Sequence, residues 1–264
     1  MVTARNARFQ QWQALLTNRK KRSQKGEFLI QGERPLTAAV EHGWRIRTWL
    51  APLDQKLSSW AKALLDRVDA RVVQVAPELL GELGESSSGT PDLLAVARTR
   101  SDDLSRIEVT ENGVVMVVDH PSGPAQLGDA IRSADAFGAC GVVVTGHEVD
   151  LYDPKTIQAS TGSLFALPVV RQPSHKEVLE WARSRNLTVV GTDENGDVDI
   201  DSYDLTKPGL LVVGHEVRGM TAGWRESCDV LARIPMGGTA RSLGTTTAAG
   251  IVLYEAARQR RFDN

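Results

Sequence analysis

The stretch VVMVVDHPSGPAQLGDAIRSADAFG, residues 114–138, decides the fold class of the chain. It begins with an apolar run at 114–118, which is typical of a strand buried on both faces of a sheet. A turn rich in proline and glycine follows, and then a helical pattern places Leu127, Ile131 and Ala134 on one face. A buried strand followed by an amphipathic helix predicts an α/β domain with a mostly parallel sheet.

The same pattern recurs towards the C-terminus. Apolar runs at 142–144, 187–190 and 210–213 predict further buried strands, with helical patterns between them. A last helix is predicted from about Thr246 to Arg261, because threonine suits a helix N-cap and arginine suits the C-terminal end. We therefore expect residues 113–264 to form the larger domain.

A second, smaller α/β domain is predicted at residues 1–98, because short strands alternate with helices there. Its first helix is predicted at 5–18. The apolar face of that helix consists of Phe9, Trp12, Leu15 and Leu16. The polar stretch TRSDDLSRIEVTEN, residues 99–112, is interpreted as the linker between the two domains.

The composition excludes several classes of protein. Hydrophobic residues make up 41% of the 264 residues, which is enough to build a core without staples. Cys140 and Cys228 are too few for a disulfide framework or a four-cysteine metal site. No apolar run approaches the ~20 residues of a membrane span, and the N-terminus lacks the apolar core of a signal peptide. We therefore expect a cytoplasmic protein without a metal and without a membrane segment.

Charge is distributed unevenly along the chain. The net charge is −2, but residues 1–34 hold eight basic and two acidic side chains and so carry +6, which leaves −8 for the rest. A basic segment on an acidic body predicts contact with a polyanion. The candidate RNA-binding residues are Arg19, Lys20, Lys21, Arg22 and Arg34. From charge alone, a solvated N-terminal helix is the alternative.

Common nucleotide and hydrolase motifs are absent. The sequence contains no G-x-G-x-x-G after the first buried strand, no G-x-x-x-x-G-K-[ST] and no G-x-S-x-G, and no histidine–carboxylate spacing of a zinc enzyme. Three glycine-bearing segments remain, at 119–138, 211–220 and 234–251. Each is predicted at the carboxyl end of a buried strand, where open α/β sheets bind ligands.

Together and in this order, these segments resemble the three motifs of the SpoU/TrmH-type branch of the SPOUT methyltransferases. The matching stretches are AIRSADAFG (130–138), VVGHEVRGM (212–220) and RIPMGGTARSLGTTTAAGIVLYEA (233–256). The block GEFLIQGERPLTAAVEHG (26–43) is similar to the ribosomal-protein-like RNA-binding domain that often precedes this catalytic domain. The resemblance covers residues 5–261.

The resemblance implies a deep trefoil knot in the C-terminal domain, a homodimer, and S-adenosylmethionine (SAM) as methyl donor. The implied acceptor is a ribose 2′-hydroxyl of RNA, with rRNA favoured over tRNA. Catalytic roles are implied for Arg132, Glu216, Ser242 and Gln126. Cofactor-binding roles are implied for Thr192, Gly214, His215, Glu216, Gly219, Ile234, Met236, Ser242, Leu243, Gly244 and Thr246. Because arginine stays protonated, Arg132 is expected to clamp a phosphate and polarise the hydroxyl.

Three polar positions depart from the family pattern. Gln126, His215 and Gly244 each stand where the resemblance leads us to expect asparagine. Gln126 keeps an amide on a longer arm, and His215 keeps hydrogen-bonding capacity, whereas Gly244 has no side chain. Two alternatives to an RNA methyltransferase therefore stay open: a SAM-dependent enzyme with a small-molecule acceptor, and an RNA- or SAM-binding homologue that has lost its chemistry.

Overall fold

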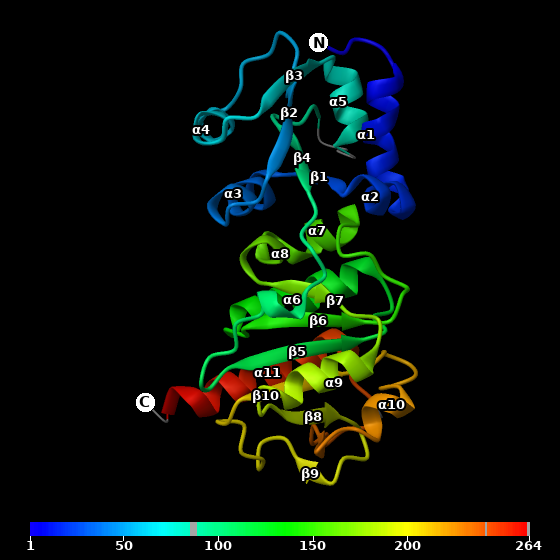
Figure 1. Ribbon diagram of the computed structural model, residues 1–264, viewed down its shortest axis with the longest axis vertical. Coiled ribbons are helices and arrows are strands. Elements are labelled where there is room, and N and C mark those ends of the chain that lie inside the picture. The colour runs from blue at the N-terminus through cyan, green and yellow to red at the C-terminus, as the bar shows by residue number, and fades with distance from the viewer. Residues whose placement is uncertain (85–88, 241, 263–264) are drawn as a thin grey trace. The chain divides into compact units, whose positions relative to one another are not determined.

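The computed structural model describes residues 1–84, 89–240 and 242–262, and it divides into two units (Figure 1). Unit 1 contains the described residues up to Arg100 together with Tyr152–Ala166. Unit 2 contains Ser101–Leu151 and the described residues from Leu167 onward. The chain thus passes from one unit to the other at three places.

Unit 1 is a small α/β unit, as the sequence predicts. Its first helices and strands are α1 (Ala7–Thr17), α2 (Arg19–Lys25), β1 (Glu27–Gln31), α3 (Glu33–Glu41) and β2 (Ile46–Pro52). They are followed by α4 (Ser59–Arg67), β3 (Arg71–Val75), α5 (Pro77–Leu83) and β4 (Leu94–Arg98). The sheet has the strand order β1-β4-β2-β3, in which β4 runs antiparallel to both of its neighbours.

Helix α1 shows why the N-terminal sequence folds as it does. The side chain of Asn6 caps the helix by accepting from the backbone N–H groups of Arg8 and Phe9. The four apolar residues predicted to share a face are all buried, in one cluster with residues of the sheet and α5. The helical period therefore identified the core-facing side correctly.

The segment between the sixth and seventh strands belongs to unit 1, although the strands before and after it in sequence belong to the sheet of unit 2. It forms α7 (Pro154–Ser160) and α8 (Ser163–Ala166). Phe28 of β1 is fully buried and lies 4.5 Å, between ring centroids, from Tyr152. Trp44 donates its indole N–H to the carbonyl of Phe165 at 2.9 Å. The core of unit 1 is therefore built from two separate pieces of chain.

Unit 2 has a seven-stranded sheet of order β7-β6-β5-β10-β8-β11-β9. Its strands are β5 (Val114–Asp119), β6 (Gly141–Thr145), β7 (Val169–Arg171), β8 (Thr188–Thr192), β9 (Val198–Asp199), β10 (Gly209–Val213) and β11 (Val230–Arg233). Every neighbouring pair is parallel, which confirms the predicted α/β class with a mostly parallel sheet. The trefoil knot stays a prediction.

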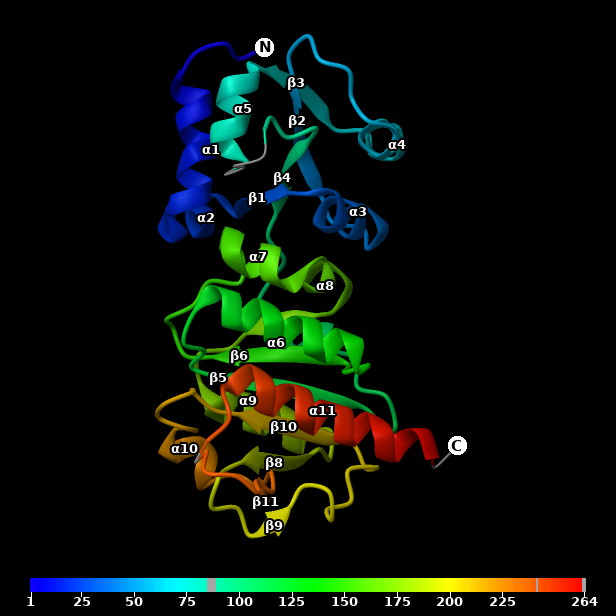
Figure 2. The same cartoon turned by 180° about the vertical axis from the view of Figure 1, so that it is seen from behind.

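Helices cover both faces of this sheet. They are α6 (Pro124–Ala136), α9 (His175–Arg183), α10 (Ala222–Arg225) and α11 (Thr245–Phe262). Helices α6 and α11 pack together on one face (Figure 2), and α9 lies on the opposite face (Figure 1). The strands β5 and β10 are buried along their whole length, as their apolar runs predict.

The stretch 99–112, interpreted as a linker, is largely part of unit 2. It contains a 3-10 turn, η1 (Leu104–Arg106), and Ile107 beside it is 1% exposed within the core of that unit. The Arg106 guanidinium donates to the carbonyl of Val169 at 3.1 Å. Leu104, Ile107 and Val109 of this stretch pack in the core of unit 2 and anchor it there.

Two features are absent from the described residues. None of the helices that the structure describes is long and apolar enough to cross a membrane. Within the same residues, no group of three or more His, Cys, Asp or Glu side chains is placed to hold a metal ion.

Candidate functional site

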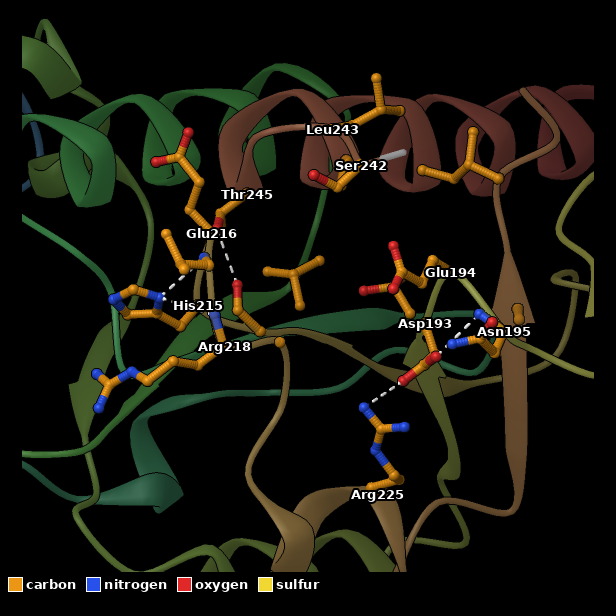
Figure 3. A pocket seen from close by; sticks show the side chains of 18 of the residues that line it. Asp193, Glu194, Asn195, His215, Glu216, Arg218, Arg225, Ser242, Leu243 and Thr245 are labelled. Carbon is orange, nitrogen blue, oxygen red and sulfur yellow. Dashed lines mark hydrogen bonds and ion pairs between the residues drawn. The ribbon is translucent and has the colours of Figure 1, made fainter. Parts of the chain in front are cut away.

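A cavity of about 350 Å³ lies at the carboxyl ends of β8, β10 and β11 (Figure 3). Its volume falls in the range of roughly 300–1,000 Å³ that small-molecule sites occupy. The lining consists of residues 192–195 and 213–219, Arg225, Ala232, Ile234, Met236, Ser242, Leu243, Thr245 and Ala248. Parallel sheets bind ligands at this edge because loops from neighbouring strands converge there.

The loop after β10 follows a tight path beside the cavity. His215 and Gly219 exchange two backbone hydrogen bonds of 3.0 and 2.8 Å, and Gly219 has a φ of +66°. A Cβ at Gly214 would collide with the backbone of Gly219 and Met220. Glycine is therefore required at both positions. Thr245, the first residue of α11, donates its hydroxyl to the carbonyl of Gly214 at 2.8 Å and joins the helix to this loop.

The side chain of His215 caps the same loop. Its Nδ1 accepts from the backbone N–H of Val217 at 3.0 Å and of Arg218 at 3.3 Å. An accepting ring nitrogen carries no proton, so these bonds favour the tautomer protonated at Nε2. An asparagine side chain commonly caps backbone N–H groups in turns in the same way. The departure at His215 thus keeps a loop-capping function.

The other two departures meet at the carboxylate of Glu216. Gln126, in the first turns of α6, donates from Nε2 to Glu216 Oε2 at 3.2 Å and accepts at Oε1 from the backbone N–H of Ser122 at 2.9 Å. A Cβ built on Gly244 would lie 3.3 Å from Glu216 Oε1. The amide of Gln126 therefore contacts the Glu216 carboxylate, which lies next to Gly244.

Two acidic residues directly after β8 line the cavity and were missed by the sequence analysis. The Asp193 side chain is 6% exposed and its Oδ2 lies 2.7 Å from Arg225 Nη2. The backbone N–H of Asn195 donates to Asp193 Oδ1 at 2.9 Å. Glu194 is exposed and also lines the cavity. The rule that drew attention to the glycine-bearing loops, position after a buried strand, applies equally to this loop and would have found it.

A buried carboxylate positions the helix that carries Arg225. Asp119, at the end of β5, is 1% exposed and accepts from the Thr145 hydroxyl at 2.7 Å, the Thr221 backbone N–H at 2.8 Å and His120 Nδ1 at 2.7 Å. Burial raises the pKa of the Asp119 carboxyl, but these hydrogen bonds outweigh it and hold the pKa below its usual value. Asp119 therefore stays ionised and fixes Thr221, the N-cap residue of α10.

Most of the predicted cofactor residues come together in the structure. Those that line the cavity are Thr192, Gly214, His215, Glu216, Gly219, Ile234, Met236, Ser242 and Leu243. Gly244 and Thr246 lie beside the lining without being part of it, and Thr245 occupies the place expected of Thr246. Arg132 is exposed on α6 and does not line the cavity. Arg241, within the third motif, lies outside the described residues.

One of the predicted RNA-binding residues, Arg22, is buried in the structure. Arg22 is 3% exposed, and its Nη1 donates to the carbonyls of Leu15 and Leu16 at 2.8 and 2.9 Å. Its Nη2 lies 3.3 Å from Asp153 Oδ2. The carbonyls at the end of α1 lack partners within their helix, and this guanidinium satisfies them. Arg22 is thus a structural residue that RNA cannot reach, whereas Lys20, Lys21 and Arg34 are exposed.

Comparison with known families now decides the classification. The family model of the SpoU rRNA Methylase family matches residues 113–254. The chain belongs to the SpoU rRNA methylase family. The SpoU L30e-like domain matches residues 6–95, in agreement with the ribosomal-protein-like domain that the sequence resembled.

Individual members of the SpoU family extend this likeness over the whole chain. A 23S rRNA (uridine(2479)-2′-O)-methyltransferase of Streptomyces viridochromogenes is 50% identical over 98% of this chain and 92% of its own length. The 23S rRNA (guanosine-2′-O-)-methyltransferase RlmB of Pseudomonas syringae is 36% identical over 84% of this chain and 88% of its own length.

Solved structures agree with the fold. The SpoU methyltransferase AviRb from S. viridochromogenes, in complex with the cofactor AdoMet, has a TM-score of 0.93 at 50% identity and covers 97% of this chain and 99% of its own. An AdoMet-bound rRNA methyltransferase from Sinorhizobium meliloti has a TM-score of 0.88 at 27% identity, with 98% and 97% covered.

The cavity of this SpoU family member has the chemistry that SAM requires. Ile234, Met236 and Leu243 supply apolar surface for a flat adenine ring. The loop at Gly214 leaves backbone groups accessible, because no side chain covers them. Glu194 and Glu216 add carboxylate oxygens that can accept hydrogen bonds from the hydroxyl and amino groups of the cofactor. The residues present therefore fit the cofactor.

Proposed function

We propose that this chain is a SAM-dependent methyltransferase that modifies a ribose 2′-hydroxyl of 23S rRNA. The observation that carries the proposal is the cavity at the carboxyl ends of β8, β10 and β11. It is lined by nine of the residues for which the family resemblance implies a cofactor-binding role. Support comes from the fold of the AdoMet complex at 50% identity and from relatives whose names specify 2′-O-methylation of 23S rRNA.

The cavity residues would hold the cofactor between the three motif loops. Bound SAM supplies a methyl group on a positively charged sulfur. Ile234, Met236 and Leu243 would contact the adenine, and the loop of Gly214 and His215 would contact the remainder through its backbone. Water is kept from the adenine by these apolar side chains.

The acceptor side is proposed at α6 and the Glu216 loop. Arg132 lies on the exposed side of α6, outside the cavity, which suits a contact with RNA. An arginine side chain is a cation with five N–H donors, so Arg132 would bind a phosphate and polarise the 2′-hydroxyl. Glu216, held by Gln126, would accept a hydrogen bond from that hydroxyl, and the hydroxyl of Ser242 would orient the reacting groups.

The remaining parts of the proposal concern partners and location. The exposed basic residues of α2 and α3, among them Lys20, Lys21 and Arg34, would bind the RNA phosphates together with Arg19. We propose a homodimer with a knotted C-terminal domain that acts in the cytoplasm, where ribosomal RNA is found. The names of these relatives specify 23S rRNA, which favours rRNA over tRNA or a small-molecule acceptor.

A labelling experiment tests the function. The protein is incubated with methyl-labelled SAM and unmodified 23S rRNA transcript, with tRNA and a small-metabolite mixture as competing acceptors. We expect label in the rRNA at one nucleotide whose 3′ linkage resists alkaline cleavage. Label in the metabolites alone, or SAM binding without any transfer, would contradict the proposal.

The Arg132→Ala variant gives the matching test of the site. We expect the rate of methyl transfer to fall by about 100-fold or more, because the guanidinium that acts on the charge developing at the 2′-oxygen is removed. The affinity for SAM, measured by calorimetry, should stay unchanged. Arg183→Ala, an equally exposed arginine on α9, is the matched control and should transfer normally. A fully active Arg132→Ala variant would remove Arg132 from the mechanism.

A further inference from the structure

The two acidic residues after β8 have different surroundings. The Asp193 carboxylate is neutralised by Arg225 at 2.7 Å and accepts from the backbone N–H of Asn195. Within the described ranges of the chain, neither an ion pair nor a hydrogen bond involves the Glu194 carboxylate. Figure 3 shows the Asp193 side chain directed to Arg225 and that of Glu194 directed to the space between the loops. The loop therefore presents one carboxylate that a ligand can use.

The adenosyl group offers two kinds of partner to such a carboxylate. One is the pair of adjacent ribose hydroxyls, which are two O–H donors for two acceptor oxygens. The other is the positive charge of the sulfonium. An acidic residue that follows a sheet strand is a known acceptor for ribose hydroxyls in other nucleotide sites.

The reaction itself argues against the sulfonium as partner. The positive charge on sulfur disappears as the methyl group leaves, so a carboxylate beside it would stabilise the reactant more than the transition state. A hydrogen bond to the ribose is made equally in both states and carries no such cost. The ribose is bonded to the adenine, whose proposed apolar wall includes Ile234 and Met236. These two residues follow β11, the strand that pairs with β8.

We propose that Glu194 binds the ribose diol of the adenosyl group, accepting hydrogen bonds from its 2′- and 3′-hydroxyls. Arg225 pairs with Asp193, so Glu194 is the carboxylate of the two that has no partner among the described residues. The assignment rests on the proposed use of SAM. It gives a cofactor-binding role to Glu194, a residue outside the three motifs.

Calorimetry with S-adenosylhomocysteine and its 2′-deoxy and 3′-deoxy analogues tests the assignment without any methyl transfer. For the wild type, loss of one hydroxyl should weaken binding about tenfold, as expected for a charge-assisted hydrogen bond. For Glu194→Gln, binding of S-adenosylhomocysteine itself should weaken about tenfold, and the ratio to the deoxy analogues should fall towards one. Glu180→Gln, an exposed acid on α9, should leave all three affinities unchanged.

Several outcomes would overturn the assignment. One is a Glu194→Gln variant that weakens all three ligands equally or not at all. Another is a Glu194→Gln variant in which binding of SAM is weakened far more than binding of S-adenosylhomocysteine, since that result places the carboxylate at the sulfonium. A thermal unfolding curve shows that the variant is folded, and Glu194→Ala repeats the measurement with a second side chain. A wild type that binds none of these compounds would refute the proposed function itself.

Discussion

Position 244 shows how a missing side chain is accommodated by its neighbours. A Cβ there would lie 3.3 Å from Glu216 Oε1, and on its other oxygen the same carboxylate receives the amide of Gln126 at 3.2 Å. An amide thus contacts Glu216 although position 244 has none. The loss at Gly244 left a lapsed site open as one alternative, but the Glu216 carboxylate keeps one amide partner, from Gln126 on α6.

This arrangement predicts a rescue between two positions. Gln126→Leu should lower the rate of RNA transfer about tenfold, because Glu216 loses a hydrogen bond that orients it. Adding Gly244→Asn should recover most of that rate, since an amide there lies within reach of the same carboxylate. A double-mutant cycle on kcat measures the coupling. Independent effects of the two changes would show that the amides do not share a role.

At the scale of elements, the loops of unit 2 are placed by buried polar contacts at the ends of strands. Asp119 at the end of β5 holds Thr221, which begins α10, and α10 carries Arg225 to Asp193 after β8. These contacts join the carboxyl ends of β5 and β8, which lie on either side of β10 in the sheet. The geometry of the cavity therefore depends on a carboxylate that does not line it.

The low pKa of Asp119 predicts how stability depends on pH. A carboxyl whose folded pKa is depressed stabilises the fold above its unfolded pKa of about 3.9, and this contribution is lost as pH falls through that value towards the folded pKa. Asp119→Asn should therefore cost about 1–3 kcal/mol at pH 7, and the difference from wild type should shrink below about pH 4. Urea unfolding at pH 3 to 7 measures it; a difference independent of pH would contradict the account.

At the scale of the whole molecule, unit 1 is completed by residues 152–166, which lie in sequence between two strands of unit 2. Phe28 and Trp44 are buried against Tyr152 and Phe165, and Arg22 pairs with Asp153. Neither unit is a single continuous stretch of chain. The domain boundaries expected from the sequence, at 1–98, 99–112 and 113–264, did not assign residues 152–166 to the N-terminal unit.

Fragments of unit 1 test whether residues 152–166 are needed for this unit to fold. Residues 1–100 alone should unfold without a cooperative transition, because several large aromatic contacts are missing, each worth roughly 1.5–3 kcal/mol against a total stability of about 5–15 kcal/mol. The same fragment joined through a flexible linker to residues 152–166 should unfold cooperatively. Circular dichroism in the near ultraviolet, which reports on the packing of aromatic side chains, follows both. Cooperative unfolding of residues 1–100 alone would show that the inserted segment is dispensable.

The sequence by itself determined the α/β class and the parallel sheet, since the hydrophobic period acts within a few residues. Its resemblance to the SpoU/TrmH motifs supplied nine residues that line the cavity. Only the tertiary structure decided that Arg22 is buried, that Gln126 reaches Glu216, that Asp193 pairs with Arg225, and that residues 152–166 complete unit 1. Those contacts join side chains up to 131 positions apart. No local period encodes them, because packing of the whole chain selects which distant side chains meet.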